Sequence, residues 1–358
     1  KSNVASPAYD WMFIVKEDVM GKRIVVVGAG AVGGYAGGHM ARNGADVTFV
    51  DPWPENVNYI RENGIQLSGI SEQERFSVPV NAFHLTEVQQ ISKERPIDIA
   101  FICMKSYDTV WATTLIKPYL AEDGFVVSLQ NCINEERIAG VVGWGKTIGC
   151  IASMISVELT EPGHVVRNVK LGGEEHTVFR VGEVHGRLTE RAKEVAELMK
   201  GGDSSKVTQN LWGERWSKLC INTMRNGLSA CTGMNGIQRD TEEFSRDVSL
   251  RLADEAIRVG RALGYDIESL GGMETQWIVD AAAGDKTAQD ACRDDLLVQC
   301  KLRTPGQRPS MGQDMRKGRR TEIDFINGFI VDKGREVGIE TPVNAALVDL
   351  VKRVERGE

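Results

Sequence analysis

A lysine and two asparagines recur at intervals of four residues near the middle of this chain of 358 residues. Lys218, Asn222 and Asn226 lie within LWGERWSKLCINTMRNGLSACTG (211–233), whose apolar positions predict a helix. Residues four apart share one face of a helix, so the three polar side chains are expected to line up. An ammonium group can protonate a developing alkoxide, and amides can orient a carboxylate or a hydroxyl. Taken alone, the pattern would also fit a solvated helix face.

A second polar group comes late in the chain, in PSMGQDMRKGRRTEIDFINGF (309–329). The helical periodicity extends from Met311 to Val337, and a helix that already starts at Ser310 would place Ser310, Asp314 and Glu322 near one face. Ser310 is a candidate to bind a substrate carboxylate. Glu322 is a candidate to bind a cofactor ribose or to fix Lys218. On their own, these residues would be interpreted as part of a helix surface.

A glycine-rich turn near the start follows the pattern G-x-G-x-x-G after a β-branched run and before a helical pattern. In this context the first glycine makes the tight turn, the second lets a pyrophosphate approach and the third lets helix and strand pack closely. The N-terminus of the helix then offers free N–H groups to the phosphates. The predicted dinucleotide-binding residues are Gly28, Ala29, Gly30, Ala31, Val32 and Gly33.

An aspartate ends the strand that follows this helix. Asp51 stands where an acid accepts hydrogen bonds from the adenosine ribose and repels a 2′-phosphate. The residues after it, PWPEN, contain no arginine or lysine, and the nearest downstream base is Arg61. Asp51 therefore favours NAD(H) over NADP(H). The alternative is that Asp51 only caps the turn before Pro52.

Composition excludes several classes of protein. A hydrophobic content of 42% and a charged content of 26% are ordinary for a globular chain, and the net charge of −7 argues against nucleic-acid binding. No apolar run is long enough to span a membrane. The seven cysteines lack C-x-x-C spacing, and the five histidines form no ligand pattern. We therefore expect a cytoplasmic protein with no metal site, acting on a small molecule.

The chain has two regions of different character. Strand and helix patterns alternate up to about Val207, which predicts a parallel sheet covered on both faces, and nearly everything after it has helical periodicity. One of these strands is expected through TIGCIASMISVEL (147–159). The expected fold is α/β, with an N-terminal Rossmann dinucleotide-binding domain followed by an all-α domain. The predicted boundaries are an extension outside the fold at 1–20, the Rossmann domain at 21–207, and a helical substrate and dimerisation domain at 208–358.

Five segments in order resemble the ketopantoate reductase (2-dehydropantoate 2-reductase) family: VVVGAGAVGGYAG, CMKS, LQN, WSKLCINTMRNGLSA and SMGQDMRKGRRTEIDFINGF. The resemblance covers nearly the whole chain from Lys22. It implies a site in the cleft between a Rossmann domain and a helical domain, a role in pantothenate biosynthesis and a homodimer. The implied roles are Lys105 at the cofactor phosphates, Asn131 between nicotinamide and substrate, Lys218 as catalytic proton donor, Asn222, Asn226 and Ser310 on the substrate, Asn235 on the substrate if one residue is missing before it, and Glu322 near both cofactor and lysine.

The expected reaction is hydride transfer between a nicotinamide cofactor and a 2-oxo or 2-hydroxy acid such as ketopantoate or pantoate. Two departures qualify it: NADP(H) is the family norm whereas Asp51 favours NAD(H), and the polar stretch from Leu270 to Pro309 is long for the family. One alternative is an NAD-dependent dehydrogenase that oxidises a different hydroxy acid or alcohol. A remote alternative is a non-catalytic NAD(H) sensor, which would need the glycine turn alone.

Overall fold

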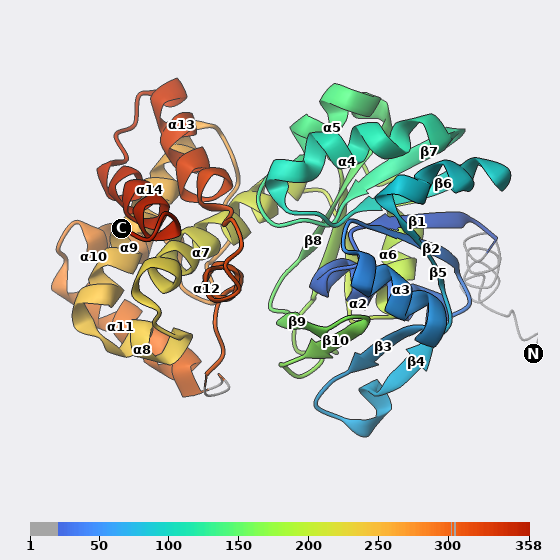
Figure 1. The fold of residues 1–358 in the computed structure, drawn as a ribbon. Helices are drawn as coiled ribbons and strands as arrows, with labels where there is room; N and C mark the ends of the chain where they lie inside the picture. Colours follow the sequence, from blue (N-terminus) through green and yellow to red (C-terminus); the bar gives the residue numbers. More distant parts are fainter. Residues whose placement is uncertain (1–20, 302, 304–305) are drawn as a thin grey trace, which may run out of the picture. The chain divides into compact units, whose positions relative to one another are not determined.

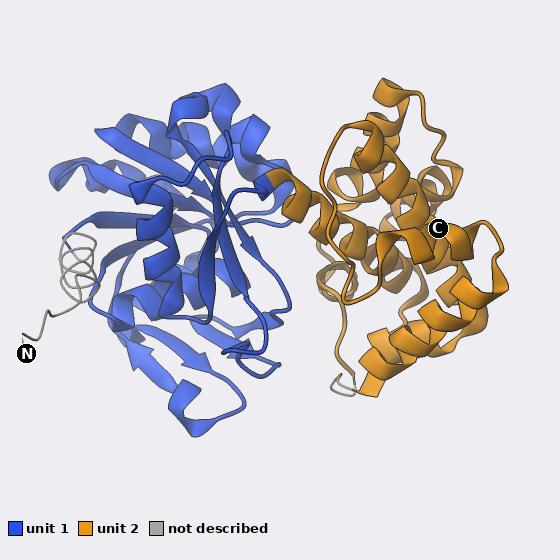
Figure 2. Ribbon diagram, turned by 180° about the vertical axis from the view of Figure 1, so that it is seen from behind, with its two compact units in different colours: residues 1–211 blue, residues 212–358 orange. Residues whose placement is uncertain are grey.

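The computed structural model describes residues 21–301, 303 and 306–358, so the predicted extension at 1–20 lies outside the described residues. The chain divides into two compact units between Leu211 and Trp212 (Figure 2). The division falls there because the last strand of the sheet runs to Thr208 and a long helix begins at Leu211. Each unit is described by itself.

Unit 1 is built on an eight-stranded sheet with the strand order β12-β11-β8-β7-β6-β1-β2-β5 (Figure 1). The six strands from β8 to β5 in this order run parallel, and β11 pairs antiparallel with β8. The strands are β1 (Arg23–Val27), β2 (Asp46–Asp51), β5 (Asn81–His84), β6 (Ile97–Ile102), β7 (Leu120–Ser128), β8 (Thr147–Ala152), β11 (Phe179–Glu183) and β12 (Ser205–Thr208). Strand β1 lies between β2 and β6, so the strand order reverses at the carboxyl end of β1. Doubly wound sheets bind ligands at such a point of reversal.

Both faces of this sheet are covered, which explains the continuous apolar run in β1. Ile24 and Val26 pack into one core, and Val25 and Val27 pack into the other. The first core includes side chains of α2 (Ala31–Arg42), α3 (Pro54–Asn63) and α6 (Glu190–Lys200), and the second includes side chains of α4 (Thr109–Ile116) and α5 (Glu135–Val142). The prediction of a Rossmann-type α/β domain is confirmed.

A second, four-stranded sheet with the order β4-β3-β10-β9 completes unit 1. The sequence predicted one strand through TIGCIASMISVEL. This is wrong, because Met154 adopts a φ of +53° and the chain continues from β8 into β9 of the other sheet. The strands are β3 (Ile65–Ser68), β4 (Phe76–Val78), β9 (Val157–Glu161) and β10 (His164–Arg167). Short 3-10 helices of unit 1 are η1 (Glu72–Glu74), η2 (Leu85–Lys93), η3 (Ser106–Asp108), η4 (Lys117–Tyr119) and η5 (Trp144–Lys146).

Unit 2 is helical in its described residues, as predicted. Its elements are α7 (Leu211–Thr232), α8 (Gly236–Thr241), α9 (Glu243–Ala262), α10 (Thr275–Ala282), α11 (Lys286–Lys301), α12 (Ser310–Arg316), η6 (Ile323–Phe325), α13 (Asn327–Val337) and α14 (Pro342–Glu355). Trp216 anchors α7: its side chain is fully buried, its indole N–H donates to the Ala256 carbonyl of α9 at 2.8 Å, and its ring lies beside Tyr265 and Phe329. Lys218 is two residues further along α7 and so points to a different side of the helix.

The predicted continuous helix from Met311 to Val337 is wrong. Helix α12 ends at Arg316, Gly318 takes a φ of +61°, and η6 intervenes before α13. A left-handed residue ends an α-helix, and glycine accepts that conformation without strain. Ser310 and Asp314 therefore share α12, whereas Glu322 belongs to the turn that follows.

Three further findings bear on the class of protein. No helix in the described part of the chain is long and apolar enough to cross a membrane. Within residues 21–301, 303 and 306–358, no three His, Cys, Asp or Glu side chains are grouped as a metal site requires. The seven cysteines are free thiols.

Candidate functional site

The glycine turn has the shape that a dinucleotide pyrophosphate requires. Gly28 sits at a φ of +103° and its N–H donates to the Val50 carbonyl at 2.8 Å. A Cβ on Gly33 would lie 2.0 Å from the carbonyl oxygen of Gly28, so this position must stay bare for α2 to pack on β1. A Cβ on Gly30 would meet nothing within 4 Å, so the surface above Gly30 is open.

The start of α2 is free to bind an anion. Gly30 is its N-cap, no side chain caps the helix, and the first turn contains no acidic residue. The first N–H groups of a helix have no partner within the helix and carry partial positive charge. Together with the open surface over Gly30, these N–H groups fit a bound pyrophosphate.

The second and third glycines of this turn, Gly30 and Gly33, give a matched pair of variants. Gly30→Ala should fold normally, because its φ of −73° suits alanine and no atom is nearby. The Gly30→Ala substitution should raise the Kd for the dinucleotide about tenfold, because the added methyl group occupies the place of the phosphates. Gly33→Ala should instead lower the unfolding free energy by roughly 1–3 kcal/mol through overpacking.

Thermal unfolding and fluorescence titration with NADH measure these two effects separately. A Gly30→Ala protein that binds NADH as tightly as the wild type would contradict the assignment of this turn to the phosphates. A Gly33→Ala protein of unchanged stability would contradict the packing described above.

Asp51 is tied into the glycine turn. Its Oδ2 accepts from the Ala29 N–H at 2.7 Å and its Oδ1 accepts from the Trp53 N–H at 2.9 Å. The Ala29 N–H is therefore engaged within the protein and is not among those offered to a phosphate. Each carboxylate oxygen retains a second acceptor position, so Asp51 can still receive ribose hydroxyls.

Basic side chains beyond Asp51 are already engaged. Arg61 forms an ion pair with Glu87 and donates to the Ala82 carbonyl at 2.6 Å. The His84 ring contacts the Pro52 carbonyl at 3.1 Å and the Thr86 hydroxyl at 3.0 Å. A 2′-phosphate placed beside Asp51 would thus find these two side chains held by other partners.

Lys105 and Asn131 follow neighbouring parallel strands, β6 and β7, at the carboxyl edge of the sheet. Lys105 lies two residues after Cys103, whose backbone approaches Gly28 so closely that a Cβ there would lie 3.0 Å from it. This places the start of the Lys105 loop against the glycine turn. Both side chains are half-buried.

Buried amides that the sequence analysis missed hold these loops. Gln130 donates to the Met104 carbonyl at 2.8 Å, and Asn134 donates to the Ser106 hydroxyl at 3.0 Å and to the Asn131 carbonyl at 2.9 Å. Gln130 directly precedes Asn131, and this adjacency was the available signal.

Asn56 does the same for the glycine turn. It is fully buried, donates to the Ala29 carbonyl at 3.1 Å and accepts from the Gly163 N–H at 2.7 Å. The turn between β9 and β10 is thereby fixed against the glycine turn. No local signal in the sequence points to this contact, since Gly163 is distant along the chain.

In unit 2, α7 carries the lysine and the two asparagines on one continuous helix, as predicted. Lys218 and Asn222 are half-buried and Asn226 is buried. The Asn222 Nδ2 is inaccessible to solvent and has no hydrogen-bond partner among the described residues. A buried amide donor without a partner is uncommon and costly, which suggests that a ligand completes it.

The start of α12 packs against the C-terminal part of the same helix. A Cβ on Gly312 would lie 2.5 Å from the hydroxyl of Ser229, one turn beyond Asn226 on α7. Arg308 donates to the carbonyl of Gly233, just after the end of α7. Ser310 lies between these two contacts and is half-buried.

Glu322 and Asn235 have different surroundings. Glu322 is buried and precedes η6, and five residues later Asn327 donates to the Thr223 carbonyl of α7 at 3.3 Å. The segment from Glu322 thus returns to α7 beside Asn222. The Oδ1 of Asn235 accepts from the N–H groups of Ile237 and Gln238 as the N-cap of α8, so a structural role already explains this asparagine and its substrate role stays a prediction.

Comparisons with known proteins agree on one family. The profile described as "Ketopantoate reductase PanE/ApbA" matches residues 24–180, and "Ketopantoate reductase PanE/ApbA C terminal" matches residues 210–355. The 2-dehydropantoate 2-reductase of Archaeoglobus fulgidus is 31% identical over 339 residues, covering 94% of this chain and 99% of the relative. That of Pyrococcus horikoshii is 31% identical over 338 residues, covering 93% and 97%.

Solved structures give the same result for the fold. A PanE/ApbA family ketopantoate reductase from Ralstonia eutropha aligns with a TM-score of 0.75 and 26% identity, covering 94% of this chain and 99% of that one. A D-mandelate dehydrogenase solved with NADH and anilino(oxo)acetate aligns with a TM-score of 0.75, at 21% identity, covering 94% and 98%. At that identity the second likeness concerns the fold alone.

Proposed function

The chain belongs to the ketopantoate reductase family, and we propose that it reduces a 2-oxo acid of the ketopantoate type with NADH, Lys218 exchanging the proton. It is a nicotinamide-dependent oxidoreductase that acts on a small molecule. The substrate, the choice of NADH and the residue roles are the proposed parts.

The observation that supports the substrate site most is the unpartnered amide of Asn222. A 2-oxo acid offers carboxylate and carbonyl oxygens, and these are the acceptors that an N–H donor needs. Asn226 follows one turn later on α7, and Ser310 starts the helix that packs beyond it. These three side chains would hold the substrate by hydrogen bonds.

Reduction adds a hydride at the C2 carbon and a proton at the oxygen, which converts the oxo acid into a 2-hydroxy acid. The nicotinamide, when bound, supplies the hydride and takes it up in the reverse direction. Lys218 would donate the proton, and its charge would stabilise the alkoxide as it forms. Glu322 would contact the cofactor and lie near Lys218, as the family resemblance implies.

On the cofactor side, the glycine turn and the start of α2 would bind the pyrophosphate. Lys105 would add a positive charge near the phosphates, and Asn131 would contact nicotinamide and substrate. The acid at Asp51, with Arg61 and His84 already engaged, supports NADH over NADPH.

The charge of Asp51 should give NADH binding a characteristic pH dependence. Burial raises the pKa of the Asp51 carboxyl, although the N–H groups of Trp53 and Ala29 act to lower it. Ribose hydroxyls donate to the ionised carboxylate, so affinity for NADH should fall as acid protonates it. Because the pKa is raised, the fall should begin at a higher pH than for an ordinary aspartate of pKa about 3.9.

Titrating NADH fluorescence between neutral and mildly acidic pH measures this effect. Asp51→Asn, which cannot ionise, should lose that part of the pH dependence. Identical pH profiles for the two proteins would show that Asp51 does not meet the ribose.

The second candidate function is oxidation of another hydroxy acid or alcohol with NAD⁺. It is favoured by the same carboxylate at Asp51, since NAD⁺ is the usual oxidant of catabolic dehydrogenases. A panel of 2-oxo acids with NADH, run beside a panel of hydroxy acids and alcohols with NAD⁺, separates the two functions. If the protein turns over only the hydroxy acids or alcohols with NAD⁺, this second function replaces the proposed one.

A further inference from the structure

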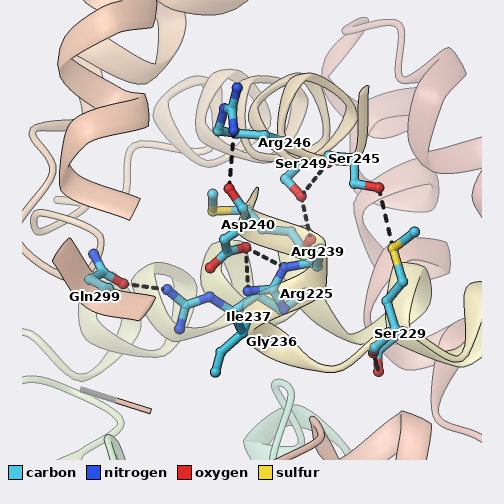
Figure 3. Close-up of polar contacts among 12 residues, drawn as sticks. Arg225, Ser229, Gly236, Ile237, Arg239, Asp240, Ser245, Arg246, Ser249 and Gln299 are labelled. Carbon is cyan, nitrogen blue, oxygen red and sulfur yellow. Dashed lines mark hydrogen bonds and ion pairs between the residues drawn. The ribbon is translucent and has the colours of Figure 1, made fainter. Parts of the chain in front are cut away.

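Arginine side chains gather at one place in unit 2 with too few carboxylates to balance them. Arg239 of α8 donates to the Asp240 Oδ1 at 2.6 Å, and Arg303 forms an ion pair with its Oδ2. Arg246 of α9 donates to the Asp240 carbonyl at 3.1 Å (Figure 3). Arg239 and Asp240 are each only 1% exposed, so both carboxylate oxygens are used inside the protein. The guanidinium cluster is defined here as Arg225, Arg239 and Arg303 around Asp240.

Arg225 of α7 is the member of the guanidinium cluster without a carboxylate of its own. Its Nη2 donates to the neutral Oε1 of Gln299 on α11 at 2.8 Å (Figure 3). Its Nε is buried and has no partner among the described residues. Gln299 in turn donates from its Nε2 to the Asp295 Oδ2 at 2.6 Å, so it stands between Arg225 and this carboxylate.

Such a guanidinium is costly to bury. Burial and the neighbouring charges of Arg239 and Arg303 lower the pKa of Arg225 to about 9, and Asp240 acts in the opposite direction. A buried charge is normally balanced by an opposite charge in contact with it. Arg225 and Arg303 are only partly buried, whereas Arg239 is fully buried, so a ligand can reach Arg225, which has no carboxylate partner.

The position of Arg225 on α7 connects the guanidinium cluster with the proposed substrate site. Arg225 is three residues after Asn222 and seven after Lys218, and these spacings place it on the same helix face. The proposed proton donor, the unpartnered amide and the unbalanced guanidinium therefore follow one another along α7. An anion that binds Arg225 would be adjacent to whatever binds Asn222.

We propose that the guanidinium cluster binds a second anionic group of the substrate, so that the enzyme prefers 2-oxo acids ending in a carboxylate, with Arg225 as the specificity-determining residue. This inference rests on the proposed function as a reductase of 2-oxo acids. It also gives a function to the polar segment from Leu270 to Pro309, because Gln299 and Arg303 both come from it.

The test compares two five-carbon substrates that differ only at the far end: 2-oxoglutarate, which ends in a carboxylate, and 2-oxopentanoate, which ends in a methyl group. Initial rates with NADH give kcat/KM for each, beside ketopantoate as reference. The wild type should prefer 2-oxoglutarate at least tenfold. In Arg225→Gln that ratio should fall on the order of 10- to 100-fold, through KM, because a charged hydrogen bond is lost.

Arg293→Gln is the matched control. Arg293 lies on α11, the helix of Gln299, but its side chain is 39% exposed and it pairs with Asp290 and Asp294 and with no member of the guanidinium cluster. This variant should keep the wild-type ratio. If Arg225→Gln does not fold, inhibition of wild-type ketopantoate reduction by glutarate and by pentanoate replaces it, and glutarate should have a Ki at least tenfold lower.

The outcomes separate the two levels of inference. Reduction of ketopantoate without a preference for 2-oxoglutarate, an unchanged ratio in Arg225→Gln, or equal inhibition by glutarate and pentanoate would overturn the role of Arg225 and leave the proposed function standing. If none of the three 2-oxo acids is reduced, the proposed function itself is overturned.

Discussion

Replacing Lys218 with alanine should lower kcat by ~10²- to 10⁴-fold, the usual contribution of a positioned proton donor. The reason is that the alkoxide would lose both its proton source and the positive charge that stabilises it. NADH binding should persist, because the glycine turn belongs to the other unit of the chain. Initial rates of NADH oxidation with saturating 2-oxo acid, together with NADH fluorescence titration, measure both effects.

Two further variants distinguish proton transfer from a purely electrostatic role. Lys218→Arg keeps the charge but gives up no proton near neutral pH, so its kcat should stay close to that of Lys218→Ala. Lys286→Ala removes an exposed lysine at the start of α11, whose side chain is 78% exposed, and should leave kcat within about twofold of the wild type. Near wild-type turnover in Lys218→Ala would remove Lys218 from the mechanism.

Asp51→Asn should reverse or abolish the preference for NADH. The substitution removes the charge that repels a 2′-phosphate, and it places an amide NH₂ against either the Ala29 or the Trp53 N–H. We expect the ratio of kcat/KM for NADH to that for NADPH to fall on the order of 10²-fold, equivalent to one or two charged hydrogen bonds. Steady-state kinetics with both cofactors at one fixed substrate concentration give this ratio.

Asp98→Asn provides the comparison. Asp98 also lies in the parallel sheet and accepts a backbone N–H, that of Arg23 at 2.7 Å, but near the start of β6 and away from the carboxyl edge. In Asp98→Asn, the ratio of kcat/KM for NADH to that for NADPH should equal that of the wild type. An equal shift in both variants would mean that the effect comes from a loosened sheet and not from contact with the ribose.

The parts of the fold that could be predicted from sequence are those that local sterics dictate. The glycine turn is an example: Gly28 must adopt a positive φ and Gly33 must lie against a carbonyl oxygen, and few residues other than glycine allow either. The alignment of Lys218, Asn222 and Asn226 follows in the same way from the period of one helix.

Two predicted elements were wrong because the backbone changes conformation at positions that carry little signal in the sequence. The strand expected through residues 147–159 is divided at Met154, a non-glycine residue with positive φ. The helix expected from Met311 to Val337 ends near Gly318. This glycine lies inside the basic stretch MRKGRR (315–320), which is also typical of a solvated helix surface. In each case the tertiary structure overrides a continuous local pattern.

The residues that hold the site together were missed because their partners are distant in sequence. Asn56 joins Gly163 and Asn327 joins Thr223, and each pair is separated by more than one hundred residues. The partner of Arg225 is 74 residues away, at Gln299. Periodicity and motifs report on neighbours along the chain, so such buried amide and guanidinium contacts emerge only from the folded structure.

The most direct test of the proposed function is the initial rate of ketopantoate reduction, measured side by side with NADH and with NADPH. We predict fast oxidation of NADH, with formation of the 2-hydroxy acid, and slower oxidation of NADPH. Faster turnover with NADPH would contradict the role of Asp51 while leaving the reductase in place. No oxidation of either cofactor would contradict the central claim that this chain reduces a 2-oxo acid of the ketopantoate type.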